Sequence, residues 1–335
     1  MKTQRAIRKF LFILNSLVAI LLLFSYFLPF ISPKTFPALA VLSLGVPILI
    51  ILNIVFFIYW LLRRKKELCI SLVTLILGFN YVTSLFLISG KSNIKENNLL
   101  VMSYNVKGFS NLGWKNKSST SVKIFDFIKT EDPDVLAIQE YYINSGIDHG
   151  FPYQYIKTKE PKSKFGYAVF SKYEIVHSGS LDFEGSQNNT IFADLKIDSD
   201  TVRVYNVHLE SLGVNPNKEN FGQENSEKLY RRLKRTFSKQ AQQTALFLTH
   251  KNAWKGKSII CGDLNNTAFS WVYNEISDGM KDAFLEAGRG FGKTYNYPYP
   301  LRIDFILTDE SFVTDNYKTH RIQYSDHFPI MANLH

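Results

Sequence analysis

The chain is poor in cysteine, because its 335 residues include only Cys69 and Cys261. Cys69 falls in an apolar run that predicts a membrane helix, and Cys261 falls in a predicted buried strand, so we expect no disulfide. This excludes a small secreted domain stabilised by a disulfide framework. The sequence also lacks internal repeats and low-complexity segments, which excludes a repeat architecture.

Acidic residues are almost absent from the first 90 residues, which hold nine Lys or Arg and a single acid, Glu67. Subtracting these from the totals of 39 basic and 29 acidic residues leaves 30 and 28, a net charge of +2 for residues 91–335. The overall charge of +10 therefore comes from the N-terminal segment. The rest of the chain is too close to neutral to favour tight, salt-sensitive binding of nucleic acid.

Charge is missing altogether from three apolar runs, Phe10–Phe30, Ala38–Leu62 and Leu68–Ser89. Each run is long enough as a helix to cross about 30 Å of hydrocarbon, which predicts three transmembrane spans in residues 1–90. The alternative is a buried helical hairpin. Phe10–Ala40 also has the form of a cleavable signal peptide, although its apolar region is long for one.

Basic residues predict how these spans are oriented. Four of them precede the first run and four more, Arg63–Lys66, follow the second, whereas the loop between the first two runs has only Lys34. Because basic loops stay in the cytoplasm, the N-terminus and Arg63–Lys66 should lie inside. Three crossings then place everything after residue 90 outside the cytoplasmic membrane, in the periplasm or the extracellular space.

After a polar linker at residues 91–98, residues 99–335 alternate strand-like runs with helical patterns. Such a chain of about 245 residues predicts one α/β domain with two packed sheets and outer helices. A hairpin is expected where two strands are separated by Asp198–Asp200. The expected strands are Leu99–Asn105, Val135–Gln139, Tyr167–Ser171, Thr190–Ile197, Thr201–Leu209, Ser258–Cys261, Ile303–Leu307 and Ile330–Leu334. The expected helices are Ser119–Thr130, Glu224–His250 and Phe269–Ile276.

One polar stretch, Gly213–Glu227, is predicted to be a loop that leads into Lys228–Lys239, where six of twelve residues are basic. This basic segment is either a solvated helix face or a surface that contacts anionic lipid headgroups or a polyanionic substrate. Each Lys or Arg close to an anionic membrane adds about 1 kcal/mol to binding.

Polar clusters at the ends of apolar runs suggest a hydrolytic site. Hydrolysis of a phosphate ester requires an activated water, an offset for the phosphoryl charge and a proton for the leaving oxygen. Mg²⁺ suits this work because it takes oxygen ligands and usually only one or two carboxylates. Glu140, which follows the apolar run Val135–Ile138, is a natural ligand, since a buried carboxylate without a cation would be costly.

Asp263 and Asn265 follow another apolar run in the sequence Gly-Asp-Leu-Asn. Residues two apart on an extended chain point to the same side, so both side chains can reach one ligand, although Asx residues are also ordinary turn formers. Asp304 and His327 offer a carboxylate that can orient an imidazole. His208, at the end of a predicted strand, could donate a proton to a leaving oxygen.

These elements resemble the endonuclease/exonuclease/phosphatase superfamily, which includes pancreatic deoxyribonuclease, abasic-site endonucleases, neutral sphingomyelinases and inositol-phosphate phosphatases. The resemblance covers roughly Leu99 to His335 and rests on Asn-Val-x-Gly, Ile-Gln-Glu, Gly-Asp-x-Asn, Arg-Ile-Asp and Ser-Asp-His. It implies a four-layer α/β sandwich of two packed, mostly antiparallel sheets flanked by helices, with the site at one sheet edge.

The resemblance also implies a role for each residue. Glu140 matches the main metal ligand, with Asn105 and Asp326 beside the metal or the phosphate. The expected metal is Mg²⁺, with Mn²⁺ or Ca²⁺ as alternatives. Among the abasic-site enzymes an acid stands where this chain has Lys107, which argues against their substrate.

Catalysis is assigned by the same resemblance. Asp263 matches the residue that positions or deprotonates the attacking water, and Asn265 matches a phosphate contact. His327, paired with Asp304, matches the phosphate-binding histidine, and His208 matches the general acid of the nuclease and sphingomyelinase branches. Two further residues are expected as secondary phosphate contacts, Asn206 and Thr294.

The sequence thus predicts a membrane-anchored, Mg²⁺-dependent hydrolase that cleaves phosphodiester bonds of nucleic acid or of phospholipid headgroups. One alternative is a phosphomonoesterase acting on substrates like inositol phosphates. Another is a binding protein that keeps the fold but has lost catalysis.

Overall fold

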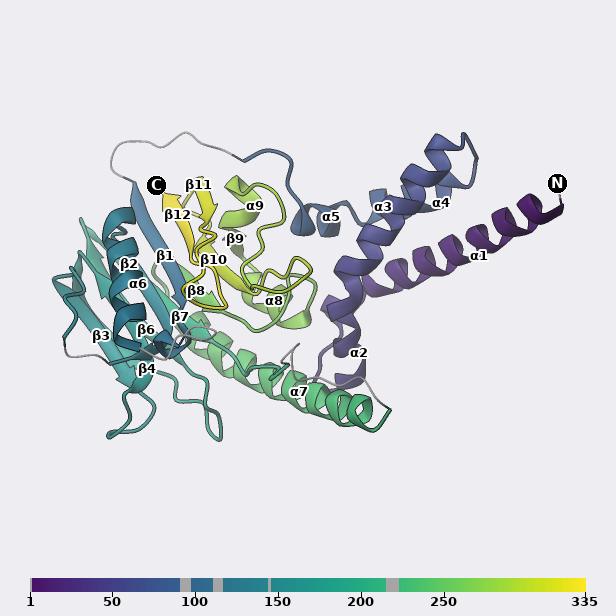
Figure 1. The fold of residues 1–335 in the computed structure, drawn as a ribbon. Helices are drawn as coiled ribbons and strands as arrows, with labels where there is room; N and C mark the ends of the chain where they lie inside the picture. Colours follow the sequence, from purple (N-terminus) through teal and green to yellow (C-terminus); the bar gives the residue numbers. More distant parts are fainter. Residues whose placement is uncertain (1, 91–97, 111–116, 144–145, 215–222) are drawn as a thin grey trace.

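The computed structural model describes residues 2–90, 98–110, 117–143, 146–214 and 223–335. It contains a helical segment at the N-terminus and an α/β domain from Asn98 onward, here called the catalytic domain after the role that the sequence predicts for it (Figure 1). Most of the predicted linker, residues 91–97, and most of the predicted loop, residues 215–222, lie outside the described residues.

The catalytic domain is built on two sheets of six strands each. The first has the order β11-β12-β1-β2-β4-β3, and the second has the order β5-β6-β7-β8-β10-β9. Neighbouring strands are antiparallel except for the central pairs β1–β2 and β7–β8, which are parallel. The strands of the first sheet are β11 (Thr314–Thr319), β12 (Ile330–Leu334), β1 (Leu99–Asn105), β2 (Val135–Tyr142), β4 (Phe165–Ser171) and β3 (Tyr153–Thr158). The strands of the second sheet are β5 (Glu174–Ser180), β6 (Thr190–Ile197), β7 (Asp200–His208), β8 (Ser258–Asp263), β10 (Asp304–Asp309) and β9 (Met280–Asp282).

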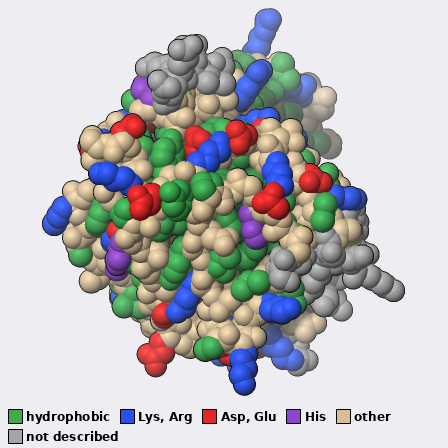
Figure 2. All heavy atoms as spheres, turned by 90° about the vertical axis from the view of Figure 1, so that its left-hand side faces the viewer, with side chains coloured by type: hydrophobic (Ala, Val, Ile, Leu, Met, Phe, Trp, Pro, Cys, Tyr) green, Lys and Arg blue, Asp and Glu red, His purple; other side chains and the backbone are tan. Residues whose placement is uncertain are grey.

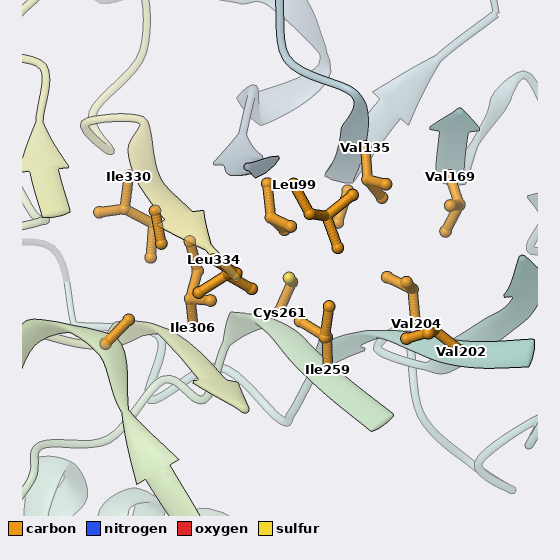
Figure 3. Close-up of a cluster of buried hydrophobic side chains, with 14 of the residues drawn as sticks. Leu99, Val135, Val169, Val202, Val204, Ile259, Cys261, Ile306, Ile330 and Leu334 are labelled. Carbon is orange, nitrogen blue, oxygen red and sulfur yellow. The ribbon is translucent and has the colours of Figure 1, made fainter. Parts of the chain in front are cut away.

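The main core lies between the two sheets. Every second residue of the central strands points into it, so Val135 and Val169 from the first sheet face Val204 and Ile259 from the second (Figure 3). All four side chains are fully buried. Because successive strand residues point to opposite faces, the other residues of the same strands are left to contact the outer helices.

Helices cover the outer face of each sheet and complete four layers. Helix α6 (Lys117–Glu131) packs Ile124, Phe125 and Ile128 against the first sheet. Helices α7 (Gln223–Ala253) and α8 (Trp271–Ser277) pack Phe247 and Val272 against the second. The short α9 (Ala283–Ala287) adds to the core between the sheets. The predicted fold class is confirmed, with two mixed sheets flanked by helices.

All eight predicted strands and all three predicted helices of this domain are present, and β6 pairs with β7 as the expected antiparallel hairpin. The strands that sequence reasoning missed are β3, β5, β9 and β11. These four are the edge strands of the two sheets. Edge strands are partly solvated and carry polar residues, so β5 and β3 lack the apolar runs that identify an interior strand.

The N-terminal segment, here called the anchor, contains two helical stretches that are long and apolar enough to cross a membrane, Thr3–Phe30 and Pro37–Leu62. The first is mainly α1 (Lys2–Ser25), continued by the 3₁₀ turn η1 (Leu28–Phe30). The second comprises α2 (Pro37–Leu42), the 3₁₀ turn η2 (Ser43–Gly45) and α3 (Val46–Leu62). The first two predicted spans are therefore present as helices of sufficient length.

The third predicted span, residues 68–89, is not one helix. Helix α4 (Leu68–Leu77) ends at Gly78, and α5 (Phe79–Leu85) continues at an angle of 82° to it. A Cβ at Gly78 would lie 2.0 Å from the ring of Tyr26, the residue that follows α1, so glycine fits at the bend where a larger residue would displace this ring. The anchor thus has two candidate spans, or three if the bent pair counts as one.

Several polar side chains of the anchor point inward, and many of its apolar side chains point outward. Asn15 and Asn53 are fully buried, and Asn15 accepts a hydrogen bond of 2.6 Å from Ser71 on another helix. Large apolar residues such as Phe24, Val55 and Leu77 are exposed. This is the inverse of a water-soluble helical domain and the arrangement expected of helices surrounded by lipid.

The two ends of the anchor differ. The N-terminus and the connection between α3 and α4 lie at the end that points away from the catalytic domain (Figure 1). There Arg8 donates a hydrogen bond of 2.7 Å to Glu67. The predicted cytoplasmic basic residues, Arg63–Lys66, therefore lie beside the N-terminus and remote from the catalytic domain.

At its other end the anchor packs directly on the catalytic domain. Tyr81 of α5 stacks on Tyr26, with ring centroids 4.7 Å apart, and on Phe269 of the catalytic domain, at 6.2 Å. Ala40 of α2 joins a buried cluster with Leu233 and Phe237 of α7. The anchor is thus joined to the catalytic domain by packing as well as by the chain.

Truncation of the core between the sheets should destabilise the protein. We expect Ile259→Ala to lower the free energy of unfolding by about 2–5 kcal/mol, because it removes buried methyl groups and leaves a cavity. Val176→Ala on the edge strand β5, where the side chain is 52% exposed, should change it by less than about 0.5 kcal/mol. Thermal unfolding of the full-length wild type and of each variant in detergent measures both changes in stability. Equal melting temperatures for the two variants would contradict the assigned core.

Candidate active site

The predicted site residues come together where the two sheets end at one edge. In the second sheet, Asp263 at the end of β8 pairs in register with both His208 on β7 and Asp304 on β10. In the first sheet, Asn105 ends β1 beside Gln139 on the parallel strand β2, one residue before Glu140. Parallel neighbours end at the same edge, so the central pair of each sheet delivers its last residues to one place.

Glu140 occupies an irregular position in β2. The register between β2 and β4 shifts between Ile138 and Tyr141, and Glu140 has a left-handed φ of 52°. A β-bulge redirects the side chain at the irregular position. Residues with strained backbone conformations are concentrated at functional sites. Alternation along the strand is broken here, and the Glu140 carboxylate, 38% exposed, lines a cavity.

Asp263 is the centre of the site and its side chain is 1% exposed. Asn105 from the first sheet donates one hydrogen bond of 3.1 Å to Asp263 and another of 3.3 Å to Glu140. The ring nitrogens Nε2 of His208 and His327 lie 3.6 and 3.7 Å from the same Asp263 oxygen. Burial raises the pKa of Asp263, and the neighbouring His327 opposes this rise.

Asn265 is held in a turn beside Asp263. Its backbone N–H donates to the Asp263 carboxylate at 2.7 Å, and its side-chain amide donates to the Leu209 carbonyl at 2.9 Å. Its φ is 49°, a left-handed value that asparagine tolerates. The preceding Gly262 has a φ of 140°, and a Cβ there would lie 1.9 Å from the Val207 carbonyl, so glycine is required where β8 meets β7.

His327 and Asp304 form the predicted pair. His327 Nδ1 lies 3.0 and 3.1 Å from the two oxygens of Asp304, and both side chains are buried. Burial by itself would lower the pKa of His327, but the carboxylates of Asp304 and Asp263 outweigh it and raise the pKa to about 10. The imidazole is therefore a cation at neutral pH, suited to an anionic phosphoryl oxygen.

His208 differs from His327 in its charge. It is fully buried, and burial lowers its pKa to about 3, so the ring is neutral in this state. Its Nε2 faces Asp263 and Glu140, and its Nδ1 has no hydrogen-bond partner among the residues that the structure describes. Two histidines with separated pKa values, on either side of one carboxylate, are typical of acid–base chemistry.

Asp326 is placed at the cavity and forms an ion pair with Lys107. Sequence reasoning noted Lys107 only as a departure from the abasic-site enzymes, and its partner lies 219 residues away in the chain. No local pattern could have linked them.

Two predicted phosphate contacts serve the framework in this structure. Asn206 lies between the sheets, donates to the Ile138 and Ala168 carbonyls at 2.8 and 2.9 Å, and accepts from Gln139. The Thr294 hydroxyl accepts from the backbone N–H of Asp304 at 3.1 Å. Both are fully buried and neither lines the cavity, although Thr294 contacts the backbone of the site residue Asp304.

A cavity of about 440 Å³ opens over these groups, a size usual for small-ligand sites. Its polar wall includes Glu140, Asp263, Asp326 and His327. Its other walls were not foreseen from the sequence. They comprise three alternate tyrosines, Tyr295, Tyr297 and Tyr299, and an apolar group, Leu44, Leu212, Val214 and Leu301.

The donor set fits a hard divalent cation. The carboxylates of Glu140 and Asp263 share one amide donor, and Glu140 has no Lys or Arg within ion-pair distance in the described part of the chain. Asp263, Asp304 and His327 form a second group whose ligand atoms all lie within 4.8 Å. We favour a position beside Glu140 and Asp263, because both carboxylates line the cavity and share the Asn105 amide, whereas Nδ1 of His327 is engaged by Asp304.

The chain belongs to the endonuclease/exonuclease/phosphatase family, because residues 102–327 match the family model described as Endonuclease/Exonuclease/phosphatase family. Residues 8–85 match a second model, described as Domain of unknown function (DUF8431). A search of curated proteins finds no match. The predicted resemblance is thus confirmed, and it defines a phosphoesterase fold with an additional N-terminal domain.

Solved structures agree on the fold. An endonuclease/exonuclease/phosphatase from Bacteroides vulgatus has a TM-score of 0.54 at 19% identity, over 72% of this chain and 99% of its own. A truncated TDP2 from Caenorhabditis elegans has a TM-score of 0.52 at 17% identity, over 72% and 99%. D. rerio TDP2, solved with a single strand DNA product, has a TM-score of 0.51 at 17% identity, over 72% and 100%.

The Asp304 carboxylate should be the main cause of the raised pKa of His327. The raised pKa of His327 contributes stability that is complete below about pH 6.5, its ordinary value, and is lost as the pH rises towards 10. We therefore expect the stability difference between wild type and Asp304→Asn to narrow as the pH rises from 6.5 to 10. Melting temperatures of both proteins in chelator measure this. A difference independent of pH would contradict the assigned pair.

Proposed function

We propose that this protein is a membrane-anchored, Mg²⁺-dependent phosphodiesterase. The observation that carries the proposal is the arrangement around Asp263, where an amide, two imidazoles and a second carboxylate from both sheets converge. Asp263, Glu140 and His327 line the cavity, and the buried Asn105 and His208 lie beside Asp263. This set holds each group that hydrolysis of a phosphate ester requires.

The roles follow from position and charge. Asp263, whose pKa is raised by burial, orients the attacking water and takes its proton. The His327 cation and the Asn265 side chain face a non-bridging phosphoryl oxygen. Glu140, with Asn105 and Asp326 beside it, would hold Mg²⁺, which when bound would offset negative charge on the phosphoryl group.

His208 is the proposed general acid. The ring is neutral without substrate because burial lowers its pKa. An anionic phosphate close to Nε2 favours the protonated ring, so substrate binding itself raises the pKa of the acid. The proton is then available to the leaving oxygen on the side of the phosphate opposite to the water.

We further propose that the catalytic domain lies outside the cytoplasmic membrane. Supporting this, the N-terminus and Arg63–Lys66 lie together at the end of the anchor remote from the catalytic domain, where the positive-inside rule places the cytoplasm. With α4 and α5 counted as a bent third crossing, this agrees with the topology expected from the basic residues.

The basic segment of α7, Lys228–Lys239, is proposed to contact anionic lipid headgroups. Its exposed basic residues flank the apolar contact between α7 and α2, at the start of the second candidate span. Lys239 is an exception, because it donates to the Glu210 carboxylate and the Gly185 carbonyl. The lipid contact therefore belongs to the N-terminal part of the segment.

Nucleic acid is the second candidate substrate. D. rerio TDP2, which shares this fold, was solved with a single strand DNA product. Substrates like inositol phosphates, or loss of catalysis on the same fold, remain the alternatives named above. Two measurements test the proposed chemistry itself, whichever substrate the protein cleaves.

Glu140→Gln should weaken activation by Mg²⁺. Removing one of the two central negative charges is expected to raise the Mg²⁺ concentration for half-maximal hydrolysis of a soluble phosphodiester at least about tenfold. Glu160→Gln, on an exposed turn, is the matched control and should leave this concentration unchanged. Isothermal titration of Mg²⁺ with the full-length proteins provides a second readout. Hydrolysis that survives strong chelation would refute the metal requirement.

Replacing His208 should stop turnover without unfolding the protein. We expect His208→Ala to lower kcat by about 10²- to 10⁴-fold, the usual contribution of general acid catalysis. His208→Asn retains more side-chain volume and should be equally slow, whereas His177→Ala on the edge strand β5 should not be slowed. Rates are compared after melting curves show that each variant folds. Wild-type turnover in both His208 variants would remove the general-acid assignment.

A further inference from the structure

The active-site cavity is not confined to the catalytic domain. Leu44, in the turn η2 between α2 and α3, lines it together with Asp263 and His327. Leu44 lies inside Pro37–Leu62, the second candidate membrane span. One cavity thus contacts both the phosphate-binding groups and a residue of the membrane segment.

The apolar side of the cavity continues into the contact between anchor and catalytic domain. Leu44, Leu212 and Val214 line the cavity and also pack in the cluster that joins α2 to Leu229 and Leu233 of α7. The cavity therefore changes from carboxylates and imidazoles at one side to aliphatic side chains at the other. A substrate that matches both sides has a phosphate ester and a hydrocarbon part.

The three tyrosines give their wall of the cavity an amphipathic character. Tyr295 stacks on Tyr297 with ring centroids 6.3 Å apart, and Tyr297 meets Tyr299 edge to face at 5.1 Å. Tyrosine combines an apolar ring with a polar hydroxyl and is enriched where membrane meets water. This wall is therefore compatible with a cavity that opens at a lipid interface.

Charge around the cavity disfavours a polyanion. Among the described residues that line it, Lys107 is the only Lys or Arg, and it is paired with Asp326. Nucleic-acid sites neutralise several phosphates with basic side chains. On the face of the catalytic domain that points away from the anchor, basic and acidic side chains are interspersed over the described surface (Figure 2). Neither surface provides a basic track for a nucleic-acid strand.

The anchor also supports the loop that carries Asp263 and Asn265. This loop runs on to Phe269, which is 3% exposed and packs in a cluster of anchor residues that includes Leu22 and Leu85. Ring stacking with Tyr81 fixes Phe269 from the anchor side. The membrane segment thus holds the catalytic loop as well as one cavity wall.

From these observations we infer that the substrate is a membrane phospholipid with a phosphodiester headgroup, bound with its phosphate beside Asp263 and its hydrocarbon part against Leu44. The inference rests on the proposed function and narrows it to one substrate class. In the reaction the oxygen of water bonds to phosphorus while the bond from phosphorus to one ester oxygen breaks. The water proton passes to Asp263, and the released alcohol takes a proton from His208.

Full-length protein in nanodiscs, supplied with Mg²⁺, tests this inference with three probes. These are phosphatidylglycerol in mixed phosphatidylglycerol–phosphatidylcholine bilayers, a single-stranded DNA oligonucleotide, and water-soluble bis(p-nitrophenyl) phosphate. Leu44→Gln should lower the ratio of lipid turnover to soluble-diester turnover about tenfold, since a polar group then interrupts the apolar wall. Leu42→Gln is the matched control, because Leu42, the last residue of the adjoining helix α2, is 57% exposed and does not line the cavity.

The outcomes separate the inference from the proposed function. Lipid cleavage by wild type, with a lowered ratio in Leu44→Gln but not in Leu42→Gln, supports the inference. Cleavage of the soluble diester or of DNA without cleavage of lipid overturns the inference and leaves the phosphodiesterase proposal standing. Cleavage of none of the three probes overturns both. An equal effect of Leu42→Gln and Leu44→Gln, or an unchanged ratio in Leu44→Gln, removes Leu44 from the substrate site.

Discussion

The packing of one sheet on the other is the constraint on which the rest of this structure depends. Residues such as Val204 and Ile259 are withdrawn from water between the sheets, and burial of apolar surface is the main favourable term in folding. This packing brings the ends of β1 and β2 level with those of β7 and β8. Asn206 reinforces the alignment, because its amide reaches from β7 to backbone carbonyls of the first sheet. The site exists only because the two sheets end together.

Burial at that edge then sets the electrostatics. Asp263 has little solvent around it, so its charge depends on Asn105, His208 and His327 rather than on water. The two histidines differ in pKa because the carboxylates of Asp304 and Asp263 raise the pKa of His327, whereas burial and the positive charges of His327 and Lys159 lower that of His208. A carboxylate as buried as Asp263 is costly without a nearby cation, so the site favours binding of a positive charge. Protein context, rather than residue type, gives each imidazole its role.

The anchor belongs to the same physical unit. Its aromatic contact with Phe269 and its cluster with α7 bury apolar surface at the boundary, so the catalytic domain sits on the membrane segment in a defined position. This docking places Leu44, a residue of the second candidate span, in the wall of the active-site cavity.

The sequence by itself determined the interior strands, the outer helices, the first two spans and the residues that meet at Asp263, because each depends on a local pattern of apolar and polar residues. It did not reveal the edge strands, whose partly solvated faces carry no apolar alternation. Nor did it reveal the bend at Gly78, where the Tyr26 ring from a distant part of the anchor leaves little room for a Cβ. Only the tertiary structure decided that Asn206 serves the framework and that Leu44 faces the active site, since both depend on contacts between segments far apart in the chain. The spacing of apolar residues along a helix or strand indicates which of its faces is buried, but not which segment packs against that face.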